Sequence, residues 1–140
     1  DWDIAFKRYA VRINSGYSGP SCVEAASLAE SVTYDDVTEV PSNLTFVGDE
    51  WMEGCVAQGD GVGLEGSYAF RLRNYWTYDG CLKMTGRVFV IALANGRHVK
   101  LTITNYYGND TAQEQCNETG GITASNRASA NFKLRWGFLD

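Results

Sequence analysis

Two methionines stand at mirrored distances from two cysteines. The chain contains Met52-Glu53-Gly54-Cys55 and Cys81-Leu82-Lys83-Met84, and it has no other methionine. If Cys55 and Cys81 were bonded, their Cα atoms would lie about 5.5 Å apart, and each methionine would lie within about 10 Å of extended chain from its cysteine. The two thioethers could then face each other. Thioether sulfur is a soft ligand that suits copper(I) or the iron of haem; the alternative is that both methionines fill gaps in the core.

The residue types of common catalytic sites do not gather into a motif. A Ser–His–Asp or Cys–His site would need the single histidine, His98, and we expect a strand-surface imidazole there. The carboxylates have no spacing that assigns an acid–base pair, and Asp60-Gly61 and Asp79-Gly80 lack the alternating oxygen ligands of a calcium loop. The glycine-rich stretch 59–63 neither follows a clear strand nor opens a helix, which argues against a phosphate site. We therefore expect no enzymatic activity.

Four well-separated cysteines, Cys22, Cys55, Cys81 and Cys116, form no Cys-x-x-Cys pair. With one histidine in the chain, a usual zinc site is not expected. We interpret the cysteines as two disulfides of an oxidising compartment, with free buried thiols as the alternative. The mirrored methionines favour Cys55–Cys81, which leaves Cys22–Cys116 as the second pairing.

The composition describes one acidic domain over residues 1–140. Apolar residues make up 44% of the chain and charged residues 21%, which excludes disorder and a coiled coil. The net charge of −5 argues against a protein that binds nucleic-acid phosphates, and no apolar run approaches the roughly 20 residues that span a bilayer. The first residues lack the basic and apolar regions of a signal peptide, so we expect a cytosolic protein or a mature form.

The clearest structural signal is a hairpin. An apolar run at 87–94 and an alternating run at 97–104 flank Asn95-Gly96, a dipeptide that predicts a type I′ turn. The first run is typical of a strand covered on both faces, and the second of a strand with one face in water.

The rest of the pattern also favours strands. Alternating apolar residues predict strands around 2–6, 68–72 and 132–138, whereas glycine-rich and polar stretches predict loops at 15–21, 59–66 and 108–121. Only residues 23–31 have a weak helical pattern. The sequence therefore predicts an all-β fold, an antiparallel sandwich-like or irregular two-sheet domain of about eight strands with long loops.

Three blocks, taken in order, carry a family resemblance. They are Trp2–Gly16, which begins Trp-Asp-Ile-Ala-Phe, then Gly19–Glu24, and finally the strand–turn–strand at 87–107 that ends in Tyr106-Tyr107. Together they resemble the HmuY-like haem-binding proteins of Bacteroidetes and related bacteria. The similarity covers most of residues 1–24 and 74–138, and residues 32–70 match poorly.

The resemblance implies an all-β haemophore, secreted or lipid-anchored, that clamps haem b between loops with two axial side chains. Those side chains are histidines in some members of the family and methionines in others. Met52 and Met84 fall near the two ligand loops and are the implied ligands, and one histidine excludes bis-histidine ligation. The other residues implied are aromatics that stack on the porphyrin or close the pocket, and cations for the propionates: Trp51, Tyr75, Trp76, Tyr78, Lys83 and Arg87. Core packing is the alternative for at least two of these aromatics.

The resemblance also implies partners and a location. Such a protein takes haem, including from haem-carrying host proteins, and hands it to a TonB-dependent receptor on the extracellular or periplasmic side of the outer membrane; a homo-oligomer is compatible with this. The alternative function is an extracellular structural or adhesive β-subunit that self-assembles or binds glycans without haem.

Overall fold

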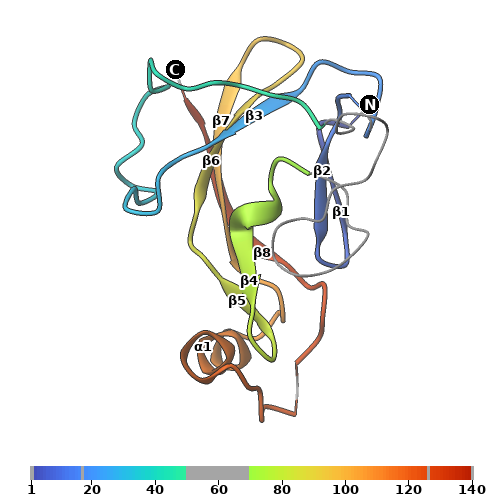
Figure 1. Ribbon diagram of the computed structural model, residues 1–140, viewed down its shortest axis with the longest axis vertical. Helices are drawn as coiled ribbons and strands as arrows, with labels where there is room; N and C mark the ends of the chain where they lie inside the picture. Colours follow the sequence, from blue (N-terminus) through green and yellow to red (C-terminus); the bar gives the residue numbers. More distant parts are fainter. Residues whose placement is uncertain (1, 17, 50–69, 126, 140) are drawn as a thin grey trace.

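A computed structural model describes residues 2–16, 18–49, 70–125 and 127–139. In this part the chain forms three antiparallel sheets and one α-helix (Figure 1). The largest sheet has the order β3-β6-β7-β8, with β3 at Glu24–Ser27, β6 at Val88–Ala92, β7 at His98–Asn105 and β8 at Lys133–Leu139. Two hairpins form the smaller sheets, β1 (Ile4–Lys7) with β2 (Ala10–Ile13), and β4 (Trp76–Tyr78) with β5 (Leu82–Met84). Helix α1, Asp110–Thr119, lies beside the β4–β5 hairpin (Figure 1). The predicted all-β fold of about eight strands is confirmed, and one domain over residues 1–140 stays a prediction.

The central hairpin β6–β7 is confirmed, but its turn differs from the prediction. The Gly96 amide donates to the Leu93 carbonyl at 2.9 Å, and the Leu93 amide donates to the Arg97 carbonyl at 2.8 Å. Gly96 has a φ of +82°, whereas Asn95 has a negative φ. A type I′ turn needs a positive φ at both central residues, so the prediction of that turn is wrong. The loop is a type I turn closed by a glycine bulge, and the Asn95 side chain accepts a bond from the Arg97 amide at 3.1 Å.

Strand β6 is covered on both faces, as its unbroken apolar sequence predicts. Phe89 and Ile91 belong to the main core, which also contains apolar residues of β2, β3 and β7. Val88 and Val90 point the other way and belong to a second cluster with Leu28, Val37 and Leu139. The strand thus separates two apolar clusters.

The predicted wet face of β7 is wrong at its centre. Thr102 is 4% exposed, and its hydroxyl donates to the Gly86 carbonyl at 3.3 Å. The neighbouring Lys100 ammonium donates to the carbonyls of Tyr34 and Val37 at 3.0 and 2.8 Å. Residues 34–37 therefore cover a face that alternation alone assigns to solvent.

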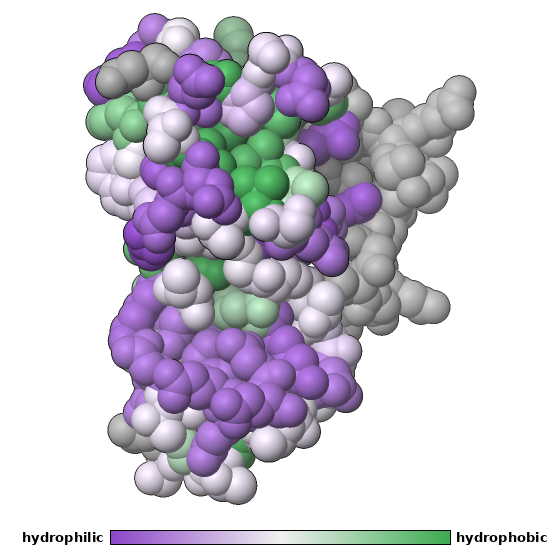
Figure 2. Space-filling view, turned by 90° about the vertical axis from the view of Figure 1, so that its left-hand side faces the viewer, coloured by the Kyte–Doolittle hydropathy of each residue, from purple (hydrophilic) through white to green (hydrophobic). Residues whose placement is uncertain are grey.

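Figure 2 shows the side of the molecule that carries the second cluster. Apolar side chains gather in its upper part among hydrophilic ones, and hydrophilic side chains dominate its lower part, where α1 lies. A pocket of about 490 Å³ lies at the second cluster. Its apolar lining includes Leu28, Val32, Val37 and Leu44.

Three predicted elements are wrong. Residues 24–27 form strand β3, not a helix, because Ala25 and Ala26 pair with Ile91 and Val90. The predicted loop at 108–121 contains α1, whose polar sequence has no apolar stripe but does have caps at both ends. Phe70 and Leu72 belong to a turn before the 3₁₀ helix Arg73–Tyr75, and Tyr68 lies outside the described residues. Among the described residues, no helix is long and apolar enough to cross a membrane.

Both predicted disulfide pairings are wrong. Cys81 is bonded to Cys116, with their Cα atoms 6.0 Å apart, because α1 packs against β5. Cys22 is an exposed free thiol beside Ser15, and Cys55 lies outside the described residues. The expectation that a disulfide is present is confirmed, but it does not link Cys55 to Cys81.

Candidate functional site

The β4–β5 hairpin places Met84 at the margin of the main core. Trp76 is directly opposite Met84, and Tyr78 is opposite Leu82, so these four side chains share one face of the hairpin. Trp76 and Leu82 are buried, Met84 is half-buried against the main core, and Tyr78 is 56% exposed. Met84 therefore shares its face of the hairpin with two buried side chains and with one exposed aromatic side chain.

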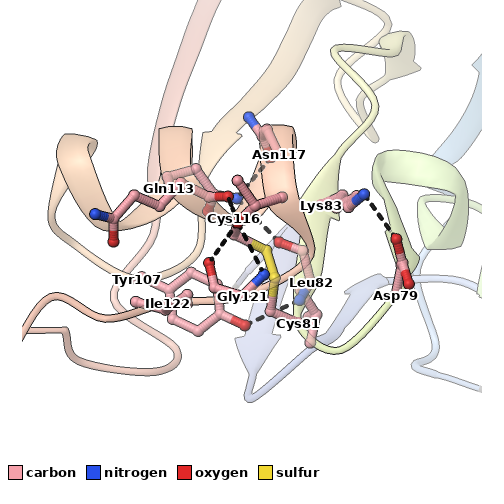
Figure 3. Close-up of a disulfide and its surroundings, with 12 residues drawn as sticks. Asp79, Cys81, Leu82, Lys83, Tyr107, Gln113, Cys116, Asn117, Gly121 and Ile122 are labelled. Carbon is pink, nitrogen blue, oxygen red and sulfur yellow. Dashed lines mark hydrogen bonds and ion pairs between the residues drawn. A yellow bond between two sulfur atoms is a disulfide. The ribbon is translucent and has the colours of Figure 1, made fainter.

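Helix α1 braces the outer edge of β5 (Figure 3). The Leu82 amide donates to the Tyr107 hydroxyl at 2.9 Å, and the Gln113 side-chain amide donates to the Leu82 carbonyl at 2.9 Å. The Cys81–Cys116 disulfide joins the same two elements covalently. The backbone groups on this edge of β5, which a further strand could otherwise pair with, are thus bonded to side chains. The disulfide holds the same edge against α1.

Local sequence explains why α1 forms although it lacks an apolar stripe. The Asn109 side chain accepts a bond from the Ala112 amide at 3.1 Å, which caps the first turn. Gly120 ends the helix in the left-handed conformation, with its amide bonded to the Cys116 carbonyl at 3.0 Å. Ala112, Gln113 and Cys116 face the core and are buried.

Two of the predicted porphyrin-stacking aromatics are core residues. Tyr75 is fully buried and its hydroxyl donates to the Tyr9 carbonyl at 2.7 Å. Burial raises the pKa of Tyr75 far above its ordinary value, so the phenol stays neutral. The Trp76 ring packs edge-on against the ring of Tyr9, with centroids 5.6 Å apart. Trp51 and Met52 lie outside the described residues.

The two predicted propionate-binding cations already hold carboxylates. Lys83 points to the opposite face of the hairpin from Met84, and its ammonium lies 2.8 Å from the Asp79 carboxylate. The Arg87 guanidinium lies 2.6 Å from the Glu30 carboxylate and donates to the Leu28 carbonyl at 2.8 Å. The hairpin therefore does not bring these two cations together beside Met84.

His98 does not join Met84 at one site. It is paired with Ala92 and Leu139 at the start of β7, and its ring packs against Phe46 at 5.5 Å. The β5 strand, in contrast, bonds to Tyr107, which follows the other end of β7. In the part of the chain that the structure describes, no group of three or more histidines, cysteines or acids could hold a metal ion.

A buried carboxylate that the sequence reasoning did not single out lies directly before residues 50–69. Asp49 is 2% exposed and accepts bonds from the Ile13 amide at 3.0 Å, the Ser18 hydroxyl at 2.7 Å and the Arg71 amide at 2.8 Å. Burial is the largest influence on this carboxyl and raises its pKa, while the bonds from Arg71, Ser18 and Ile13 oppose that shift. Asp49 thus ties the chain before residue 50 to the chain after residue 69 and to the end of β2.

The comparisons with known proteins agree with the fold. The model of the HmuY protein family matches residues 1–119, and no curated protein matches the chain. Similar solved structures include a lipoprotein candidate from Bacteroides fragilis NCTC 9343, with TM-score 0.56 and 15% identity. Another is a candidate HmuY-like heme-binding protein from Bacteroides vulgatus ATCC 8482, with TM-score 0.52 and 16% identity. Each match covers 97% of this chain and 69% of the other, and at such identities the likeness is one of fold.

Proposed function

The chain belongs to the HmuY protein family, and on that premise we propose that it is a haem-binding protein of a bacterial cell envelope. In this proposal it captures haem b on the extracellular or periplasmic side of the outer membrane and passes it to a TonB-dependent receptor. Its chemistry is ligation rather than turnover. The family, and the HmuY-like heme-binding description of the Bacteroides vulgatus protein, support haem as the ligand.

The proposed site rests on one observation: Met84 is half-buried against the main core. Met84 is the only methionine in the part of the chain that the structure describes. Its neutral, soft sulfur is a suitable axial donor for haem iron, and the buried Trp76 opposite it excludes water from one side. Bound haem would supply an iron whose reduction potential a thioether ligand raises.

Met52 completes the proposed axial pair on the strength of the resemblance alone. It lies outside the described residues, and Cys81 is bonded to Cys116, so the bridge that the mirrored spacing predicts does not form. Haem titration of a Met52 variant is therefore the test of this ligand.

The side chains around Met84 differ in how readily they could contact a porphyrin. Tyr78 is on the same face and exposed, so it can contact a porphyrin without repacking the core. Trp76 and Tyr75 are both buried and would remain in the core. Lys83 and Arg87 could bind propionates only by exchanging their present carboxylate partners for those of haem.

The test is haem titration followed by absorbance in the oxidised and reduced states. We expect a Soret band with saturable binding, tighter under reducing conditions because a thioether favours ferrous iron. Met84→Leu keeps the volume but removes the sulfur, so it should weaken binding and change the low-spin spectrum. His98→Leu is the matched control and should bind as the parent does. Absence of a Soret shift in the parent protein would refute the haem function; an unchanged spectrum in Met84→Leu would refute the ligand.

Strand β8 favours a second candidate function, self-assembly. It is an edge strand of its sheet, and Trp136 and Phe138 are 57% and 44% exposed on its surface. Together with Phe6 of β1 they line an apolar groove of about 270 Å³, and exposed apolar edges promote pairing between chains. Sedimentation velocity of the haem-free protein distinguishes the two functions. A colourless oligomer that Trp136→Lys converts to monomer would favour assembly, whereas a monomer that binds haem would exclude it as the main function.

A further inference from the structure

The edge of β5 that carries Met84 is bonded to the side chains of one face of α1. The Met84 amide donates to Oδ1 of Asn117 at 2.9 Å, one residue after the disulfide-bonded Cys116. Gln113 lies one helical turn before Asn117 and bonds the Leu82 carbonyl two residues before Met84. Because residues four apart lie on one face of a helix, α1 presents these two amides to β5 in register (Figure 3).

The Asn117 side chain is itself held in place. The Gln113 side-chain amide also donates to Oδ1 of Asn117, at 2.9 Å, so this oxygen accepts two bonds. Gln113 is in turn anchored at its other end, where its Oε1 accepts a bond from the Tyr106 amide at 2.8 Å. The bonds run from the end of β7 through Gln113 and Asn117 to the backbone of Met84, and Gln113 is buried.

We propose that Asn117 is a positioning residue for Met84, whose backbone amide its side-chain oxygen holds. This inference rests on the proposed function. The bond to the Met84 amide fixes the position of the strand backbone from which the thioether side chain projects. A ligand held in advance loses less conformational freedom on binding. Partners that bond the ligating group itself typically contribute about 10–100-fold in affinity, and for a backbone partner such as Asn117 we expect the lower end of that range.

The experiment compares three variants with the parent protein in haem titration and in amide hydrogen exchange without haem. Asn117→Leu removes the acceptor at similar volume, so we expect faster exchange of the Met84 amide, roughly tenfold weaker haem binding and an altered low-spin spectrum. Asn117→Asp keeps an acceptor oxygen and should restore most of the affinity. Asn109→Ala removes the cap of α1 without touching Met84, so it should lower the melting temperature yet leave the haem spectrum unchanged.

The outcomes separate this inference from the proposed function. If Asn117→Leu binds haem with the parent affinity and spectrum while Met84→Leu does not, the positioning role is refuted and the ligand role stands. If Asn109→Ala weakens binding as much as Asn117→Leu at equal loss of stability, the effect is only structural and the positioning role is refuted. If the parent protein binds no haem, both proposals fail together.

Discussion

The backbones of Gly80 and Gly120 are in contact where the turn of the β4–β5 hairpin lies against the end of α1. Both have positive φ, +71° and +72°. A Cβ on Gly80 would collide with the Gly120 carbonyl oxygen, and a Cβ on Gly120 would lie 2.7 Å from the Asp79 carbonyl oxygen. The contact lets the helix approach the hairpin closely enough for Cys81 and Cys116 to bond.

Gly120→Ala should therefore destabilise the protein by at least about 2 kcal/mol, because left-handed strain adds to a collision with backbone that cannot move aside. Chemical denaturation measures the change. Gly86→Ala is the control: Gly86 also has a positive φ, +69°, but a Cβ there would meet nothing within 4 Å. It should lose only about 1 kcal/mol. Equal losses in the two variants would contradict the close approach.

The disulfide should be Cys81–Cys116 and should stabilise the fold. Replacing both cysteines by serine should lower the free energy of unfolding by about 2–4 kcal/mol, because the bond restricts the unfolded chain. Cys22→Ser alters an exposed thiol and should change stability by less than about 0.5 kcal/mol. Non-reducing peptide mapping checks the pairing directly, and a peptide that links Cys81 to any other cysteine would overturn it.

Asp49 should make stability depend on pH with a definite sign. Burial raises its pKa in the folded protein above the ordinary value of 3.8, so the folded state binds this proton more tightly than the unfolded state does. The contribution of the Asp49 proton to the free energy of unfolding is fully present below about pH 4, and it falls as pH rises through the higher pKa of the folded state. The difference in the free energy of unfolding between the parent and Asp49→Asn should therefore decrease as pH rises, and it should become constant above the folded pKa. A difference that grows with pH over this window would contradict the raised pKa.

Asp49→Ala should cost more than a surface change at any pH. It removes the acceptor of the Ile13 and Arg71 amides, and an unsatisfied buried donor such as the Ile13 amide costs about 1–3 kcal/mol. Asp36→Ala removes an exposed carboxylate whose bonds, within the described residues, go to Thr33, so it is a suitable control. Similar melting temperatures for both variants would show that Asp49 does not hold the three segments together.

Gly96→Val should destabilise the β6–β7 hairpin by about 1–3 kcal/mol, because a β-branched residue resists a φ of +82°. A Cβ at this position would meet no neighbour within 4 Å, so the loss reports backbone strain alone. Gly96→Asn should be much milder, since asparagine tolerates this region. Thermal unfolding of the two variants measures the difference, and an unchanged melting temperature for valine would mean that the loop adopts another turn.

Short-range signals determined the strands that the sequence predicts correctly. The Asn95-Gly96 dipeptide between an apolar run and an alternating run led to β6 and β7, and alternation led to β1 and β8. These signals act within a few residues, where turn geometry and side-chain period are local properties. The exact turn was missed because type I′ and bulged type I loops share the same glycine requirement.

Helix α1 shows where local pattern failed. Its sequence is polar around most of its circumference, so periodicity favours a loop, although Asn109 and Gly120 are a cap at each end. Stability comes from the disulfide and from side chains that bond to β5, which lies some thirty residues earlier. A single-sequence pattern contains no information on such distant partners.

The β-rich class, the central hairpin and the family could be predicted from the sequence, because they depend on local propensity and on motifs in a fixed order. Contacts made in the tertiary structure set the Cys81–Cys116 bond, the burial of Tyr75 and Trp76 in the core, and the pairing of Lys83 and Arg87 with the carboxylates of Asp79 and Glu30. These outcomes depend on which elements pack together. Cysteine pairing, burial and charge pairing are properties of contacts between segments far apart in the chain, and spacing along the sequence does not set them.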